Sequence, residues 1–246
     1  MNLTYDKQAI SVDCVIFGFD GKSLRVLLKQ RQRELPSGEV LVDSKLPGSL
    51  ISDSEDLTCA AQRVVQTLIG LRNINLRQME IFSDPQRVQG NELEWINKYY
   101  GITLSRVVTM VFFTLVKLDS KLIAYTERRE ADWVELNDVR HLAFDHNKIL
   151  IAAIDRLITL FRQEPVAFDF LPRKFTLRHL QNLYEAVYDI AIDNRNFRKK
   201  MLSLPYIVPS GESEKEVSHK PAQYYYFDRR KYRQKNNKIF KLGFIY

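Results

Sequence analysis

Cysteine is scarce in this chain. Its two copies, Cys14 and Cys59, lie far apart within apolar patterns and form no CxxC pair. Disulfide scaffolds and zinc-binding modules need several cysteines at short, regular spacing, so the chain fits neither class. We expect two buried free thiols and, because free thiols persist in reducing compartments, a cytoplasmic protein.

Long hydrophobic runs are also missing. The longest apolar stretch, Val107 to Val116, is interrupted by threonine and is shorter than the roughly 20 residues that a membrane-spanning helix needs. The first residues, Met1 to Lys7, are polar and lack the apolar core of a signal peptide. We expect neither a membrane span nor a signal peptide.

Charge is present but uneven along the 246 residues. The net charge is +7, yet residues 173–246 hold 16 Lys and Arg against 7 Asp and Glu, whereas residues 1–172 hold 21 against 23. A hydrophobic content of 45% is sufficient for globular cores. The imbalance suggests two domains, of which the basic one binds a polyanion.

Two prolines mark the boundary between these domains. Glu164-Pro165 interrupts an apolar helix pattern, and Leu171-Pro172 precedes the next one. We therefore place the first domain at 1–163 and the second at 164–246.

A short loop followed by one helix organises the first domain. Leu46-Pro47-Gly48-Ser49 forms the loop, Ser52 and Glu55 have the spacing of a capping box, and Gly70 ends the pattern. Between them, apolar residues recur at helical intervals: Leu57, Ala60, Ala61, Val64, Val65 and Leu68. The arrangement resembles the Nudix box, a glycine-rich loop leading into a helix that carries metal-binding glutamates.

The later glutamates of the Nudix box are missing. In an ungapped alignment, Glu55 stands at the early glutamate of the box and Arg63 at its arginine. Gly48 and Gly70 stand at two of its glycines. Val64, Thr67 and Leu68 replace the other three acids on one face of the helix. Magnesium requires anionic oxygen ligands, which these side chains do not supply. The resemblance therefore implies a retained fold without catalytic residues, metal or cofactor, although an ordinary amphipathic helix would show the same pattern.

Strand patterns surround the box. Residues 9–19 and 24–28 predict a hairpin, 76–82 and 106–118 predict further strands, and the polar residues 30–39 predict a loop. Strands mixed with helices predict an α+β fold. Together with the box, they imply a Nudix-like α/β/α sandwich with a mixed sheet, followed by the second domain.

Further segments resemble one branch of the superfamily, the Nudix-related transcriptional regulators. They are Phe82-Ser83-Asp84-Pro85, Arg106-Val107-Val108-Thr109, Ala131-Asp132-Trp133-Val134 and Leu142-Ala143-Phe144-Asp145-His146, in the order of that family. The last segment precedes 149–161, whose apolar spacing predicts a helix packed on the sheet.

Residues 89–104 form a longer connection than this family usually carries, and they predict an extra helix. Its aromatic residues Trp95, Tyr99 and Tyr100 offer stacking surfaces for a sugar or base. We expect them instead to pack the insertion against the domain.

Two short helices and a hairpin are predicted in the second domain. Thr176 can cap a helix with an apolar stripe, and Asp193 can cap a second helix that is basic. Residues 206–208 and 224–227 predict two strands around a polar loop. A tight helix pair followed by a hairpin is typical of a winged helix-turn-helix, whose second helix reads base edges.

The second domain also resembles the same regulators. Two segments are similar to the family's sequence: Leu180-Gln181-Asn182-Leu183-Tyr184-Glu185-Ala186 and Asp193-Asn194-Arg195-Asn196-Phe197-Arg198-Lys199. The resemblance therefore covers almost the whole chain. It implies a homodimer that binds a palindromic site in double-stranded DNA. The residues expected to contact DNA are Thr176, Arg178, Asn194, Arg195, Asn196, Arg198, Lys199, Lys220 and Gln223.

Residues of the effector site follow from the position of a Nudix cleft. We expect Glu55 and Arg63 to pair with each other or with loop amides. We interpret Asp145 and His146 as a helix cap with a neighbouring histidine, and not as an acid–base pair. The residues expected to bind the effector are Arg31, Lys45, Asp84, Arg87 and Arg106.

The sequence thus predicts a cytoplasmic transcriptional regulator whose inactive Nudix-like domain senses a small molecule. Members of the family respond to ADP-ribose or to sugars, and the lost glutamates lead us to favour a sugar such as a pentose. A Nudix hydrolase with metal ligands from Glu80, Asp84, Glu92 or Glu94 stays an alternative. So does an RNA-binding module, because a basic winged domain with exposed tyrosines can stack bases.

Overall fold

The computed structural model describes residues 7–34, 38–72, 74–215 and 221–234. The chain forms two compact units. The first comprises Met1–Phe17, Arg25–Leu115 and Asp119–Ile154, and the second comprises Gly18–Leu24, Val116–Leu118 and Asp155–Tyr246. The predicted boundary between 163 and 164 falls at the end of a long helix, whereas the units divide inside it.

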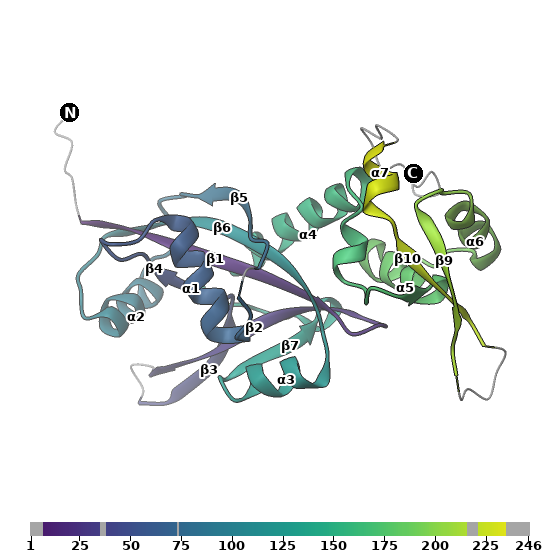
Figure 1. Cartoon of the computed structure of the whole chain (residues 1–246). Helices are drawn as coiled ribbons and strands as arrows, with labels where there is room; N and C mark the ends of the chain where they lie inside the picture. Colours follow the sequence, from purple (N-terminus) through teal and green to yellow (C-terminus); the bar gives the residue numbers. More distant parts are fainter. Residues whose placement is uncertain (1–6, 35–37, 73, 216–220, 235–246) are drawn as a thin grey trace. The chain divides into compact units, whose positions relative to one another are not determined.

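A seven-stranded sheet forms the centre of the first unit (Figure 1). Five strands follow the order β3-β2-β1-β6-β5, while β4 pairs with β1 and β7 pairs with β2. The inner strands are buried because their side chains are apolar on both faces, as in Val15, Ile16 and Phe17 of β1. The strands are β1 (Gln8–Phe19), β2 (Leu24–Glu34), β3 (Val40–Lys45), β4 (Gly48–Leu50), β5 (Arg77–Phe82), β6 (Arg106–Lys117) and β7 (Ala131–Glu135).

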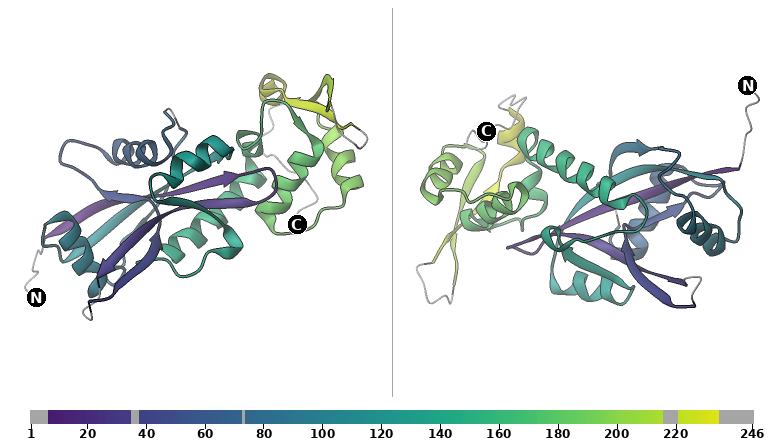
Figure 2. Two further views of the ribbon diagram at one scale, coloured as in Figure 1. Left: turned by 90° about the horizontal axis from the view of Figure 1, so that it is seen from below. Right: turned by 180° about the vertical axis from the view of Figure 1, so that it is seen from behind.

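Helices cover both faces of this sheet, which confirms the predicted α/β/α layering. The front view and the rear view place α1 on one face and the first half of α4 on the other (Figures 1 and 2). Each buries an apolar stripe, with Ala61 and Val65 in α1 and Ile149 and Ala153 in α4. The helices are α1 (Leu57–Ile69), α2 (Asn91–Tyr100), α3 (Ser120–Glu127) and α4 (His146–Gln163).

The box helix starts one turn later than the predicted capping box. Asp56 is the N-cap of α1, and its carboxylate accepts a hydrogen bond from the Cys59 amide at 2.7 Å. Ser52 and Glu55 do meet, since the Ser52 amide donates to Glu55 Oε1 at 3.0 Å, but they lie in the preceding turn. The helix ends at Gly70, whose left-handed φ of 69° suits a residue without Cβ.

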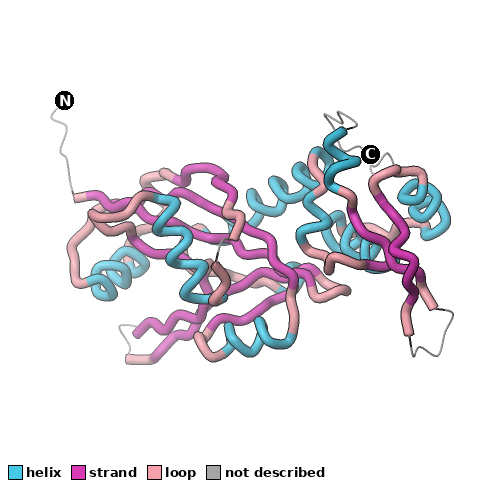
Figure 3. Tube along the Cα trace, in the orientation of Figure 1, coloured by secondary structure: helices cyan, strands magenta, loops and turns pink. Residues whose placement is uncertain are grey.

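The second unit contains a three-stranded sheet and short helices (Figure 3). Its strand order is β8-β10-β9, and all pairs are antiparallel. The helices α5 and α6 are followed by the hairpin of β9 and β10, as a winged helix-turn-helix requires. The elements are β8 (Phe175–Thr176), α5 (Leu177–Tyr188), α6 (Asn194–Leu202), β9 (Ile207–Ser213), β10 (Gln223–Phe227) and α7 (Arg229–Gln234).

Several local predictions were wrong. The expected loop 30–39 is partly strand, because β2 continues to Glu34 and β3 follows it at the sheet edge. Helix α3 was not predicted. Cys14 is buried as expected, but Cys59 is exposed on α1. Within the described residues, no helix is long and apolar enough to cross a bilayer.

Candidate functional site

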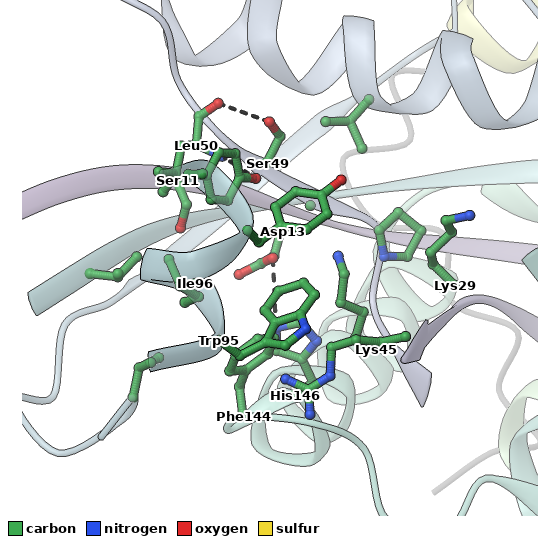
Figure 4. Close-up of a pocket in the computed structure, with 18 of the residues that line it drawn as sticks. Ser11, Asp13, Lys29, Lys45, Ser49, Leu50, Trp95, Ile96, Phe144 and His146 are labelled. Carbon is green, nitrogen blue, oxygen red and sulfur yellow. Dashed lines mark hydrogen bonds and ion pairs between the residues drawn. The ribbon is translucent and has the colours of Figure 1, made fainter. Parts of the chain in front are cut away.

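A pocket of about 600 Å³ opens in the first unit, on the side of the box loop. Its wall combines loop and helix residues of the box with side chains from β1, β2, β3 and α2. Figure 4 shows ten of these side chains by name. Charged and aromatic groups therefore converge on one cavity, an arrangement typical of small-molecule sites.

The helix face that lacks glutamates forms part of this wall. Val64, Thr67 and Leu68 all line the pocket. Arg63 lies beside them, and its guanidinium donates to Glu55 Oε2 at 2.9 Å and to Leu50 O at 3.3 Å. This pairing confirms the structural role expected for Arg63 and Glu55. The hydrogen bond to Arg63 also lowers the pKa of the Glu55 carboxyl to about 2.

Arg31 is held rigidly in the pocket wall by two carboxylates and two rings. Its guanidinium donates to Asp43 at 2.7 Å and is paired with Glu92 from α2. Its Cζ lies 4.9 Å from the ring centre of Trp95 and 4.7 Å from that of Phe144. Burial lowers the pKa of Arg31, but the hydrogen bonds to Asp43 and Glu92 outweigh it and raise the pKa above its usual value. Arg31 thus fastens α2 to the sheet.

A second buried cation, Arg87, joins two carboxylates at the pocket floor. Its Nε and Nη2 donate to the two carboxylate oxygens of Asp145 at 2.9 and 2.8 Å. Asp13 Oδ2 lies 3.6 Å from Arg87 Nη2. Burial raises the pKa of Asp13, although Arg87 and Lys45 act to lower it. Asp145 precedes α4 as expected, and its carboxylate serves Arg87.

His146 is a buried hydrogen-bond acceptor. Its Nδ1 accepts from the Leu46 amide at 2.8 Å, and its Nε2 lies 3.6 Å from Asp13 Oδ1. Burial lowers its pKa well below the usual value, and the charge of Lys45 adds to this effect. The neutral ring with its proton on Nε2 therefore ties the box loop to α4.

Lys45 extends from the end of β3 into the pocket, between Asp13 and Lys29 (Figure 4). Its Nζ donates to Leu46 O at 3.3 Å. Burial lowers its pKa, and the nearby Asp13 partly offsets that effect. Lys45 thus directs its amino group into the pocket.

Aromatic residues of α2 form the opposite wall. Trp95 and Tyr99 are stacked with ring centres 4.9 Å apart, and both line the pocket with Tyr100. Trp95 and Tyr100 also pack against the core cluster that contains Val88 and Ile96. The packing role expected for these two residues is confirmed, and the same residues face the cavity.

Three of the five residues expected to bind the effector lie together. Arg31, Lys45 and Arg87 line the pocket. Asp84 does not, since its carboxylate caps the turn at the Gln86 amide, and Arg106 donates to Ser83 O at 2.5 Å outside the lining. Asp13 and Phe144 also line the pocket, and neither was predicted as a pocket residue. Asp13 was detectable as the one acid within the apolar run of β1.

Helix α6, the expected recognition helix, is oriented by its buried side. Phe197 and Met201 are fully buried, and the Phe197 ring lies 6.1 Å from that of Tyr184 in α5. Gln181 secures the turn between the helices by donating to Ile192 O at 2.8 Å. The opposite face of α6 is consequently exposed, and it carries Asn194, Arg195, Asn196, Arg198 and Lys199.

Four other residues were expected to contact DNA. Arg178 and Gln223 are exposed, and Gln223 Oε1 accepts from the Tyr225 hydroxyl. Thr176 is buried, because its hydroxyl caps α5 by accepting from the His179 amide at 3.2 Å. It supports the helix from inside and is not a surface residue. Lys220 lies outside the described residues.

Comparisons with known proteins agree with this two-part architecture. Residues 167–227 match the family described as the NrtR DNA-binding winged helix domain. The ADPR responsive transcriptional repressor NtrR of Acinetobacter baylyi is 26% identical over 228 residues, which cover 91% of this chain and 83% of that protein.

Solved structures show the same fold. The structure of Shewanella oneidensis NrtR complexed with a 27mer DNA has a TM-score of 0.68 and 22% identity, covering 89% of this chain and 93% of that one. A MutT/nudix family protein from Enterococcus faecalis has a TM-score of 0.61 and 20% identity, covering 92% and 89%. The chain is therefore similar to NrtR-type, Nudix-related proteins over most of its length, with a Nudix-like sheet followed by an NrtR-type winged helix domain.

Proposed function

We propose that this protein is a transcriptional regulator whose Nudix-like unit binds ADP-ribose and whose winged helix unit binds operator DNA. The observation that carries the proposal is the exposed basic face of α6 within a segment that matches the NrtR DNA-binding family. The pocket beside the box supplies a separate place for an effector. ADPR is the effector in the name of the Acinetobacter relative.

The preference for a pentose effector has no support in these comparisons. A sugar was favoured because, without the glutamates, the box lacks the metal site that would bind a diphosphate. The pocket nevertheless offers cations and stacked rings that suit a nucleotide: Lys45, Arg31, Trp95 and Tyr99. We therefore replace the sugar with ADP-ribose in the proposal.

We further propose that the Nudix-like unit binds without hydrolysing. The positions of three metal-binding acids are held by Val64, Thr67 and Leu68 in the pocket wall. Of the alternative ligands considered, Glu92 is paired with Arg31. Incubation of ADP-ribose with the protein and magnesium should yield no AMP. Turnover that Glu55→Gln abolishes would restore the hydrolase alternative.

Fluorescence anisotropy on duplexes from the gene's own upstream region tests the regulatory proposal. At fixed near-physiological salt, one duplex should bind about 10³-fold or more tightly than random DNA, and ADP-ribose should shift that affinity. L-arabinose serves as the matched negative effector. Binding no tighter than to random DNA, or stronger competition by RNA than by duplex, would contradict the proposal.

The regulator should act as a homodimer on a palindromic site. A two-fold protein that presents two copies of α6 would meet half-sites separated by about one or two helical turns, roughly 10 or 20 base pairs. Sedimentation velocity with the duplex would report two chains per duplex. A complex with one chain would exclude this arrangement.

A further inference from the structure

The pocket does not fit the magnesium ion that a Nudix box normally holds. Magnesium requires oxygen ligands at near-octahedral geometry, usually one or two carboxylates together with waters and substrate phosphates. The helix face where they would stand presents two apolar side chains and one hydroxyl, those of Val64, Leu68 and Thr67. Arg63 has engaged the remaining acid of the box, Glu55. The donor set here is therefore wrong for a magnesium site.

A lysine also lines this pocket. Lys45 immediately precedes the box loop, and its side chain extends into the cavity that Val64 and Leu68 line (Figure 4). Its Nζ retains two further protons after donating to Leu46 O. A positive charge is thus already present in the pocket without a bound metal.

In contrast to Lys45, the arginines of the pocket wall form ion pairs with carboxylates. Arg31 pairs with Asp43 and Glu92, and Arg87 pairs with Asp145. Lys45 forms no ion pair within 4.0 Å among the described residues; burial lowers its pKa, and the nearby Asp13 offsets this only in part. A lysine desolvated in this way gains from an anion at its ammonium group, because the anion stabilises the charged form.

We propose that Lys45 binds the diphosphate of the effector directly and so performs the charge neutralisation that a metal performs in Nudix enzymes. This inference rests on the proposed function, since it names how the ADP-ribose anion is recognised. Lys29 stands at the same wall, where Glu130 and Arg129 O position its ammonium group, and it can share the phosphate oxygens.

Isothermal titration of ADP-ribose into the full-length protein tests the inference. The titration is run in EDTA and again in excess magnesium chloride, with the native chain and with Lys45→Met, Lys45→Arg and Lys121→Met. Lys121 is an exposed lysine of α3 away from the pocket and is the matched control. Circular dichroism melts verify that each variant is folded, and Lys45→Arg keeps the charge if Lys45→Met does not fold.

The expected affinity of the native chain is the same in both buffers. Lys45→Met should weaken it about 10-fold or more, as for loss of a charged hydrogen bond, whereas Lys45→Arg should retain most of it and Lys121→Met all of it. Inorganic pyrophosphate should displace ADP-ribose from the native chain better than from Lys45→Met.

Magnesium-dependent binding, or equal affinities for Lys45→Met and Lys121→Met, would overturn this inference and leave the regulatory proposal standing. Native protein that binds ADP-ribose in neither buffer would overturn both. The two failures are therefore distinguishable in one set of titrations.

Discussion

At the scale of single residues, the box is retained where its geometry is needed. Gly48 pairs with Asp13 across β4 and β1, and a Cβ at Gly48 would lie 2.0 Å from Asp13 Oδ1 and 2.8 Å from Val12 O. Gly70 takes a left-handed φ, and a Cβ there would meet the Tyr125 ring at 2.5 Å. Both glycines are required by close packing and not by metal chemistry.

Gly48→Ala should therefore lower the free energy of unfolding by about 1–3 kcal/mol, the usual cost of overpacking. Urea denaturation followed by circular dichroism measures it. Ser54→Ala, in the exposed turn before α1, should change stability by no more than about 0.5 kcal/mol. Equal stabilities of the two variants would show that the loop shifts to accommodate a Cβ at position 48 at little cost, and would contradict this prediction.

His146 should stay neutral in the folded protein as the pH falls below the usual histidine pKa of about 6.5. Burial and the charge of Lys45 lower its pKa. The unfolded state then binds the extra proton, so the stability from His146 is fully present above about pH 6.5 and is lost as the pH falls. Nitrogen-15 spectra of labelled histidine, assigned with His146→Gln, should show the proton on Nε2. A signal that titrates near pH 6.5 would contradict this.

Only part of the site was readable from the residues. The alignment showed that Val64, Thr67 and Leu68 replace the acids of the box, and these three residues lie in the pocket wall. Asp13 was not identified, although it is the one acid in an apolar strand, because its role depends on Arg87 and His146 arriving from distant segments. Asp84 and Arg106 were placed in the cleft by position alone, and local backbone contacts hold them elsewhere.

At the scale of elements, we expect α6 to make two kinds of contact with DNA, to base edges and to phosphates. Arg195 and Asn196 lie in its first turn, where a recognition helix reaches base edges, and Lys199 lies further along the exposed face. Asp193 caps the helix by accepting from the Asn196 amide at 2.8 Å. Position along the helix should thus decide between base reading and phosphate binding.

Arg195→Ala and Asn196→Ala should each reduce discrimination between operator and random DNA by about 1–3 kcal/mol. Lys199→Ala should weaken both equally and reduce the salt dependence by about one phosphate contact. Anisotropy titrations over a range of salt concentrations give both quantities. Uniform losses at all three positions would mean that another element reads the bases.

Elements with strong periodic patterns were predicted correctly, namely α1, α4, α5, α6 and the long strands. The failures have a common cause in weak local signals. Strand β3 lies at the sheet edge with Val40 and Val42 exposed, so it shows no alternation of buried and exposed positions. Helix α3 is short and contains Thr126, and it forms through packing on β7 and α1, which the sequence does not display.

At the scale of the whole molecule, the excess of basic residues in 173–246 is consistent with separate tasks for the two ends of the chain. The near-neutral part holds the pocket, and the basic part presents α6. If the proposed function holds, allosteric coupling is reciprocal: the factor by which ADP-ribose changes operator affinity should equal the factor by which operator changes ADP-ribose affinity.

Variants in the two units should therefore separate the functions. Lys45→Met should keep operator affinity and need a higher ADP-ribose concentration for the response, whereas Arg195→Ala should keep ADP-ribose affinity and bind the operator more weakly. Paired titrations, each ligand in the presence and absence of the other, measure the coupling factor in both directions. Unequal factors would indicate a further equilibrium such as assembly.

The proposed absence of hydrolysis at the wall formed by Val64, Thr67 and Leu68 has a consequence for the signal that such a regulator would report. A sensor that destroyed its effector would register how fast the molecule is supplied, and it would reset by consuming it. A pocket that only binds reports the standing concentration, and it resets when the effector dissociates. The response to a fall in effector should then occur at the rate of release from the pocket, whereas the response to a rise should become faster as the effector concentration increases.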